Sequence, residues 1–132
     1  MAMLNKLLLI LALALGNTNS WLPLVEPQVV IDCDDDETGY ISSGETDEYM
    51  LSATNGDLVW IRVFSTDIAL NPRVQVFSPG NVLMGTWQAN PAGFVEIPNF
   101  ALNQGSGQYR ITVSDGIGNQ AGSYSISVQI YN

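Results

Sequence analysis

The sequence contains no histidine, one cysteine and only four lysine or arginine residues among its 132 residues. Without histidine, no serine or cysteine can be activated by an imidazole, and no imidazole can bind zinc. The 13 acidic residues give a net charge of −9, so the chain lacks the clustered basic residues that bind nucleic acid. The single cysteine, Cys33, excludes an internal disulfide and leaves a buried thiol or an intermolecular partner as alternatives. We therefore expect a non-catalytic protein with no nucleic-acid partner.

Residues 1–20 have the pattern of a secretory signal peptide. Lys6 supplies the positive charge, an apolar run from Leu7 to Leu15 follows, and small residues allow cleavage after Ser20 or Gly16. The apolar run is shorter than the ~20 residues that span a bilayer, so an uncleaved anchor is the less favoured alternative. The sequence predicts export to a secreted, extracellular or cell-surface location, with no membrane span in the mature chain.

The rest of the chain alternates between apolar and polar residues, as strands do, with turn residues between the alternating stretches. In one such stretch, Val59, Ile61 and Val63 share one face, and Trp60 and Arg62 lie on the other. Twelve glycines and six prolines oppose helices. We expect an all-β fold, a single antiparallel β-sandwich that is jelly-roll-like and has about eight to nine strands.

Two local features predict turns and strand pairs. The sequence Ser78-Pro79-Gly80-Asn81 suits a type II turn, in which Gly80 would have a positive φ. The stretches GQYRITV (residues 107–113) and GSYSISV (residues 122–128) repeat one pattern and are separated by turn-compatible residues. This arrangement predicts an antiparallel hairpin.

The stretch TGYISSGETDEYMLSATNGDLVWIRV (residues 38–63) resembles the opening of bacterial pre-peptidase C-terminal (PPC) domains, with its G-x-I, G-E-x-D-x-Y and G-D motifs. VQVFSPGNVLM and the two G-x-Y strands resemble the second half of these domains. The resemblance covers residues 38–131 and depends on the order and spacing of short motifs. It implies a β-sandwich that is usually non-catalytic and attached to secreted proteases or other exported enzymes. We therefore divide the chain into a signal peptide (1–20), an apolar strand with an acidic linker (21–37) and a PPC-like domain (38–132).

An acidic run precedes this domain. Asp32, Asp34 and Asp36 alternate, as oxygen ligands of a Ca²⁺ ion would. The run departs from the EF-hand pattern, because Glu37 stands where that loop needs glycine. A solvated acidic loop that keeps a strand edge soluble is the favoured alternative.

Trp60 and Arg62 are candidates for contact with a ligand or partner. If Val59, Ile61 and Val63 form the core, Trp60 is exposed beside Arg62, an arrangement that suits binding of an extracellular protein or polysaccharide. If the opposite face packs against the second sheet, Trp60 belongs to the core. Periodicity alone leaves both alternatives open.

Residues 21–31, WLPLVEPQVVI, are strongly apolar and need to be buried. In the favoured alternative they form an edge strand of their own sheet, because Pro23 and Pro27 exclude a central position. In the other they add to a sheet of the next copy, with residues 34–39 as the hinge, which would build an open filament. The residues of this assembly strand are Trp21, Leu22, Leu24, Val25, Val29, Val30 and Ile31.

Together these features predict an exported, non-catalytic β-sandwich that serves as an extracellular structural or adhesion module. Strand donation between copies would make it a filament subunit. The alternative is a secreted module that binds carbohydrate or protein, and a compact hydrolase is the least favoured class.

Overall fold

The computed structural model describes residues 29–32, 34–67, 69–89, 93–118 and 120–131. The predicted signal peptide, residues 21–28 and Cys33 lie outside these ranges. Within them, no helix is long and apolar enough to cross a membrane. The strands are β1 (Val29–Val30), β2 (Asp35–Ile41), β3 (Thr46–Ala53), β4 (Asp57–Ser65), β5 (Pro72–Phe77), β6 (Leu83–Gln88), β7 (Phe94–Leu102), β8 (Gly107–Asp115) and β9 (Gly122–Tyr131).

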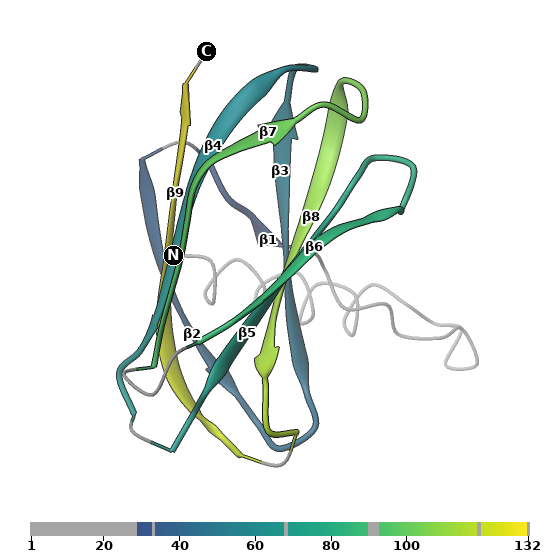
Figure 1. The fold of residues 1–132 in the computed structure, drawn as a ribbon. Coiled ribbons are helices and arrows are strands. Elements are labelled where there is room, and N and C mark those ends of the chain that lie inside the picture. Colours follow the sequence, from purple (N-terminus) through teal and green to yellow (C-terminus); the bar gives the residue numbers. More distant parts are fainter. Residues whose placement is uncertain (1–28, 33, 68, 90–92, 119, 132) are drawn as a thin grey trace, which may run out of the picture.

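The strands form two sheets that pack face to face (Figure 1). The five-stranded sheet has the order β1-β3-β8-β5-β6, and the four-stranded sheet has the order β2-β9-β4-β7. Every pairing is antiparallel except that of β1 with β3, which is parallel. The expected all-β sandwich is therefore confirmed, with one parallel pair at its edge.

The alternation along β4 shows which face of the sheet is the core. Val59, Ile61 and Val63 are fully buried, whereas Trp60 is half-buried and Arg62 is exposed. Because side chains alternate between the two faces of a strand, Trp60 lies on the outer face of the four-stranded sheet. This resolves the alternative that the sequence left open for Trp60.

The two G-x-Y strands do not form the predicted hairpin. β8 lies between β3 and β5, whereas β9 lies between β2 and β4 in the other sheet. Tyr109 and Tyr124 are fully buried, one contributed by each sheet. Asp115 holds the crossing connection by accepting hydrogen bonds from the backbone N–H groups of Gly118 (2.6 Å) and Gln120 (3.1 Å). The hairpin prediction was wrong because turn-compatible residues also suit a crossover between sheets, and periodicity does not identify a strand's partner.

The turn between β5 and β6 also differs from its prediction. The N–H of Asn81 donates to the carbonyl oxygen of Ser78 at 2.8 Å, and the positive φ, 66°, belongs to Asn81 and not to Gly80. A type I turn followed by a left-handed residue joins the strands. Asparagine tolerates this conformation, and Pro followed by Gly is compatible with both turn types.

The first described residues are held within their own molecule. Val29 and Val30 pair with Tyr49 and Met50 of β3. Ile31 is fully buried and donates its N–H to the carbonyl oxygen of Met50 at 3.0 Å. This part of the apolar N-terminal segment therefore forms an edge strand in its own sheet.

The acidic run connects two strands that belong to different sheets, and its second half is itself part of a paired strand. Asp34 has a φ of 68° and donates its N–H to the carbonyl oxygen of Val128 at 2.8 Å. The next residue, Asp35, begins β2, which pairs with β9 along its whole length. Because β1 and β2 belong to different sheets, the acidic run carries the chain from one sheet to the other and then continues as a paired strand.

Candidate functional site

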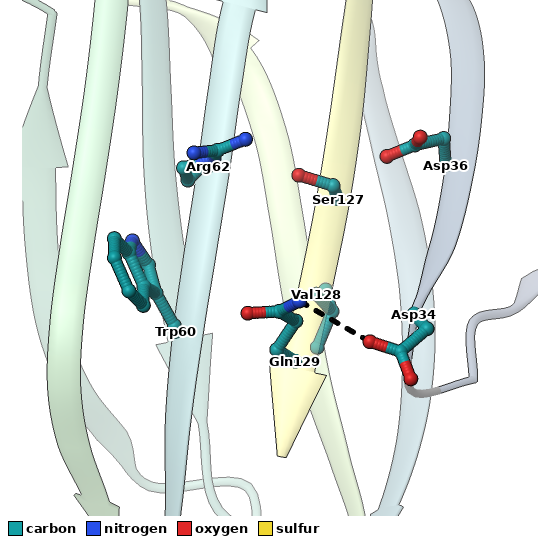
Figure 2. A pocket seen from close by; sticks show the side chains of 7 residues that line it. All are labelled: Asp34, Asp36, Trp60, Arg62, Ser127, Val128 and Gln129. Atoms are coloured by element: carbon teal, nitrogen blue, oxygen red, sulfur yellow. Dashed lines mark hydrogen bonds between the residues drawn. The ribbon is translucent and has the colours of Figure 1, made fainter.

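A hollow of about 210 Å³ lies on the outer face of the four-stranded sheet, across β2, β9 and β4. In Figure 2, Trp60 and Arg62 extend from β4 on one side, and Asp34 and Asp36 extend from the chain at β2 on the other. Side chains of β9 lie between the two sides. The lining residues are Asp34, Asp36, Trp60, Arg62, Ser127, Val128 and Gln129.

The strand register explains why these residues meet. Ser127 of β9 is the direct partner of Asp36 on one side and of Arg62 on the other. Gln129, two residues further along, is the partner of Trp60. A serine between larger side chains leaves a depression, because residues on one face of neighbouring strands lie only ~5 Å apart.

A bulge lies directly beside this hollow. The pairing of β4 with β7 shifts register between Val59 and Ile61, so Pro98 and Asn99 of β7 oppose Trp60 alone. Asn99 has a φ of 53° at this point. Bulges often redirect a neighbouring side chain, and here the bulge leaves Trp60 without a direct cross-strand partner on β7.

Hydrogen bonds fix the two sides of the hollow. The indole Nε1 of Trp60 donates to Oε2 of Glu96 at 3.0 Å, and the guanidinium carbon of Arg62 lies 5.8 Å from the Trp60 ring centre. Across the hollow, Nε2 of Gln129 donates to Oδ1 of Asp34 at 3.2 Å. The indole and one carboxylate are thus held in place before any ligand binds.

The chemistry of the lining is mainly polar. Carboxylates accept hydrogen bonds, the guanidinium of Arg62 donates them, and the hydroxyl of Ser127 does both. Trp60 adds an aromatic surface among these groups. The hollow is therefore suited to binding a ligand that carries both polar groups and a flat apolar face.

The structure brings together two candidate sites that the sequence predicted separately. Asp34 and Asp36, two of the three predicted calcium ligands, line the same hollow as Trp60 and Arg62, the predicted contact residues. Asp32 is not part of the lining; its N–H donates to the carboxylate of Asp35 at 3.1 Å. Among the described residues no group of three metal-ligating side chains is gathered, and the calcium site stays a prediction.

Sequence reasoning missed the residues of β9 that form the floor. Ser127 and Gln129 fall on the outward positions of a strand that was assigned to a hairpin, so their neighbours were misplaced. The available signal was the series of small polar residues Ser123, Ser125 and Ser127, which alternates with buried Ile and Val. Small outward residues on a central strand indicate a depression only when its neighbours are known.

Of the predicted assembly strand, the structure places Val29, Val30 and Ile31 in the molecule's own five-stranded sheet. Trp21, Leu22, Leu24 and Val25 lie outside the described residues. Whether these four residues pair in their own molecule or in another copy remains a prediction.

Comparison with known proteins gives neither a matching family model nor a matching curated protein. Solved structures do match. The PPC domain of a collagenase from Bacillus anthracis has a TM-score of 0.62 and 21% identity, and the match covers 80% of this chain and 100% of that chain. The protein has a PPC-like fold. The resemblance stated from the sequence motifs is confirmed at this level.

Two further neighbours are small proteins of similar size. A periplasmic inhibitor of g-type lysozyme from Aeromonas hydrophila matches with a TM-score of 0.57 and 18% identity, covering 77% of this chain and 97% of its own. A surface-associated copper-binding protein from Methylomicrobium album matches with a TM-score of 0.57 and 11% identity, covering 79% and 98%. At these identities the likeness concerns the fold alone. These three neighbours are a periplasmic protein, a surface-associated protein and a domain of a collagenase.

Proposed function

We propose that the protein is an exported, non-catalytic adhesion module that attaches to an extracellular polysaccharide through the hollow on its four-stranded sheet. The observation that carries this proposal is the meeting of Trp60 and Arg62 with Asp34 and Asp36 around one depression. Export follows from the predicted signal peptide. A non-catalytic role agrees with the absence of histidine from the sequence.

A polysaccharide fits the chemistry of this lining. Sugar rings present a C–H face, which packs on an aromatic side chain such as Trp60, and hydroxyl groups, which both donate and accept hydrogen bonds. Asp34 and Asp36 accept such bonds and Arg62 donates them. A long polymer passing over the hollow could engage many copies of the module on one surface, which strengthens weak individual contacts.

Binding to a panel of insoluble and soluble polysaccharides tests the proposal. We expect the exported protein to bind at least one polymer, and Trp60→Ala to lower that affinity tenfold or more, where tenfold corresponds to about 1.4 kcal/mol. Phe64→Ala is the matched control, because Phe64 is 44% exposed on the same face of β4 but does not line the hollow. Equal binding by Trp60→Ala and the unmodified protein would contradict the proposal.

A second candidate function is that of a structural subunit that assembles by N-terminal strand donation. The supporting observation is that β1, which directly follows the apolar residues in the sequence, lies at the edge of the five-stranded sheet. Electron microscopy of the purified protein tests this function directly. Regular filaments that disappear when residues 21–25 are deleted would support it, whereas uniform single particles would contradict it.

A further inference from the structure

The four edge strands of the sandwich differ in how they are protected against pairing with another chain. Within the described residues β1 is two residues long, and β2 carries the charges of Asp35, Asp36 and Glu37. β7 contains Pro98 and the bulge opposite Trp60. Short length, charge, proline and bulges are the features that natural proteins use to prevent unwanted pairing of sheet edges.

β6 is the exception. Its sequence LMGTWQ has neither a charged residue nor a proline, and its register shift lies at its start, beside Leu83. Within the described part of the chain, β6 pairs only with β5, so its outer edge presents unpaired backbone groups from Gly85 onward. Such an edge is a template for strand addition.

A hollow that is partly lined by exposed apolar side chains adjoins the start of β6. Val82 is 57% exposed and Leu83 is 48% exposed. Together with Met84 they line the hollow with Phe100 and Ala101 of β7 and with the polar residues Asn103 and Gln104. Exposed apolar side chains next to an unprotected strand edge are expected where a partner segment docks.

We infer that the outer edge of β6, with the hollow at Val82 and Leu83, accepts residues Trp21–Val25 of a second copy as an added strand. This inference deepens the second candidate function, strand donation, and is independent of polysaccharide binding. The side chains of the five donor residues are uncharged and largely apolar, which matches the uncharged edge and the exposed apolar side chains of Val82 and Leu83. In an extended strand Leu22 and Leu24 share one face.

Proline is compatible with this added strand. Backbone N–H groups point alternately toward and away from a neighbouring strand, so Pro23 takes a position that donates no hydrogen bond when Leu22 and Leu24 donate to β6. Five residues extend over about 17 Å, enough to cover the four residues of the regular part of β6, which span about 14 Å. Glu26 follows directly, and its charge would end the apolar segment.

Distance excludes the molecule's own β6 as the acceptor. A strand added beside β6 lies five strand positions from β1, which is about 24 Å at the usual spacing. Only residues 26–28 separate Val25 from Val29, and this connection spans at most about 14 Å when fully extended. Residues 21–25 therefore reach a β6 edge in a second copy, and a contact between two different edges builds an open chain of copies.

Complementation between two variants tests this inference. The first variant lacks residues 21–25 and keeps an intact β6, and the second carries Leu83→Lys and keeps its donor segment. Each is exported, processed and analysed by size-exclusion chromatography with light scattering, after circular dichroism has confirmed that it folds. We expect oligomers from the unmodified protein, monomers from each variant alone, and a 1:1 dimer that grows no further from their mixture.

Control variants distinguish two hypotheses: that β6 is the acceptor edge, and that the donor segment pairs with some other edge. Ile117→Lys places the same charge on an aliphatic residue that is 60% exposed and lies in the β8–β9 connection, and we expect it to assemble normally. Val82→Lys replaces Leu83→Lys if the latter fails to fold. Normal assembly of both lysine variants at β6 would overturn β6 as the acceptor while leaving strand donation intact. A monomeric unmodified protein at all concentrations would overturn both, and neither result bears on polysaccharide binding.

Discussion

The hydroxyl oxygens of Tyr49 and Tyr124 lie 2.6 Å apart and join the two sheets through the core. Tyr124 of β9 donates to Oδ2 of Asp47 at 2.6 Å, so its own oxygen accepts the proton of Tyr49. Both rings are almost completely buried, and Asp47 and Tyr49 belong to β3. A chain of hydrogen bonds thus runs from Tyr49 of the five-stranded sheet to Tyr124 of the four-stranded sheet and back to Asp47 of the five-stranded sheet.

The residues of this hydrogen-bonded cluster come from the sequence motifs that resemble PPC domains. Asp47 and Tyr49 come from G-E-x-D-x-Y, Tyr124 comes from the last G-x-Y, and Gly39 comes from G-x-I. Gly39 pairs directly with Tyr124 in the β2–β9 ladder. Residues that are far apart in the sequence therefore meet at one point in the core, where they join the two sheets.

Replacing Tyr124 with phenylalanine should destabilise the protein. The substitution keeps the buried ring but removes the hydroxyl group that accepts a hydrogen bond from Tyr49 and donates one to Asp47. A buried polar group left without its partner costs about 1–3 kcal/mol. We expect urea unfolding to show a loss of this size, with Tyr40→Phe, at a tyrosine that is 55% exposed, remaining within about 0.5 kcal/mol of the unmodified protein. Equal effects at both positions would show that the hydrogen-bond chain contributes nothing.

Stability should fall at alkaline pH. Burial raises the pKa of Tyr49 to about 12, and burial together with the hydroxyl of Tyr49 and the carboxylate of Asp47 also raises the pKa of Tyr124. In the unfolded chain these tyrosines ionise near pH 10, so above that pH the unfolded state binds fewer protons than the folded state. The contribution of these two tyrosines to the free energy of unfolding is complete below pH 10 and decreases as the pH rises toward 12.

The slope of this decrease identifies its source. Each tyrosine that ionises only on unfolding lowers the free energy of unfolding by about 1.4 kcal/mol per pH unit. Urea unfolding between pH 9 and 12 should show the decrease, and Tyr124→Phe should reduce its slope because one of the two groups is gone. An unchanged slope in this variant would assign the alkaline loss to other residues.

Gly39 should not tolerate a larger side chain. A Cβ atom at this position would lie 2.4 Å from the hydroxyl oxygen of Tyr124 and 2.5 Å from its ring carbon Cζ. Because the ring is enclosed on all sides, Gly39→Ala has to displace it or the backbone, at a cost of about 1–3 kcal/mol. Gly80→Ala is the control, since its nearest neighbour would be the Ser78 oxygen at 3.8 Å. Thermal melting of both variants distinguishes a local clash from a general effect of removing glycine.

The alternation of side chains predicted the strand β4 and the sandwich itself, because burial of one face imposes a period of two, but it left open which face of β4 is the core. It did not predict strand partners. Ser127 lies between Asp36 and Arg62 only because β9 enters the four-stranded sheet, a choice that depends on contacts between distant parts of the chain. The residues on the two sides of the hollow could therefore be predicted separately, but neither the floor between them nor their meeting at one site could be predicted. The parallel pairing of Val29 and Val30 depends on the same kind of long-range contact.

Substitutions in the β5–β6 turn can distinguish the turn type predicted from the sequence from the one found in the structure. The type II turn predicted from the sequence requires the positive φ at Gly80, whereas the structure places it at Asn81, with a φ of 66°. Alanine in a left-handed conformation costs roughly 1–2 kcal/mol, and asparagine is one of the few residues that adopt it readily. We expect Asn81→Ala to destabilise the protein by about 1 kcal/mol, Asn81→Gly to be tolerated and Gly80→Ala to have little effect, as measured by urea unfolding. A greater loss at Gly80→Ala than at Asn81→Ala would restore the type II turn and would contradict the backbone described for these strands.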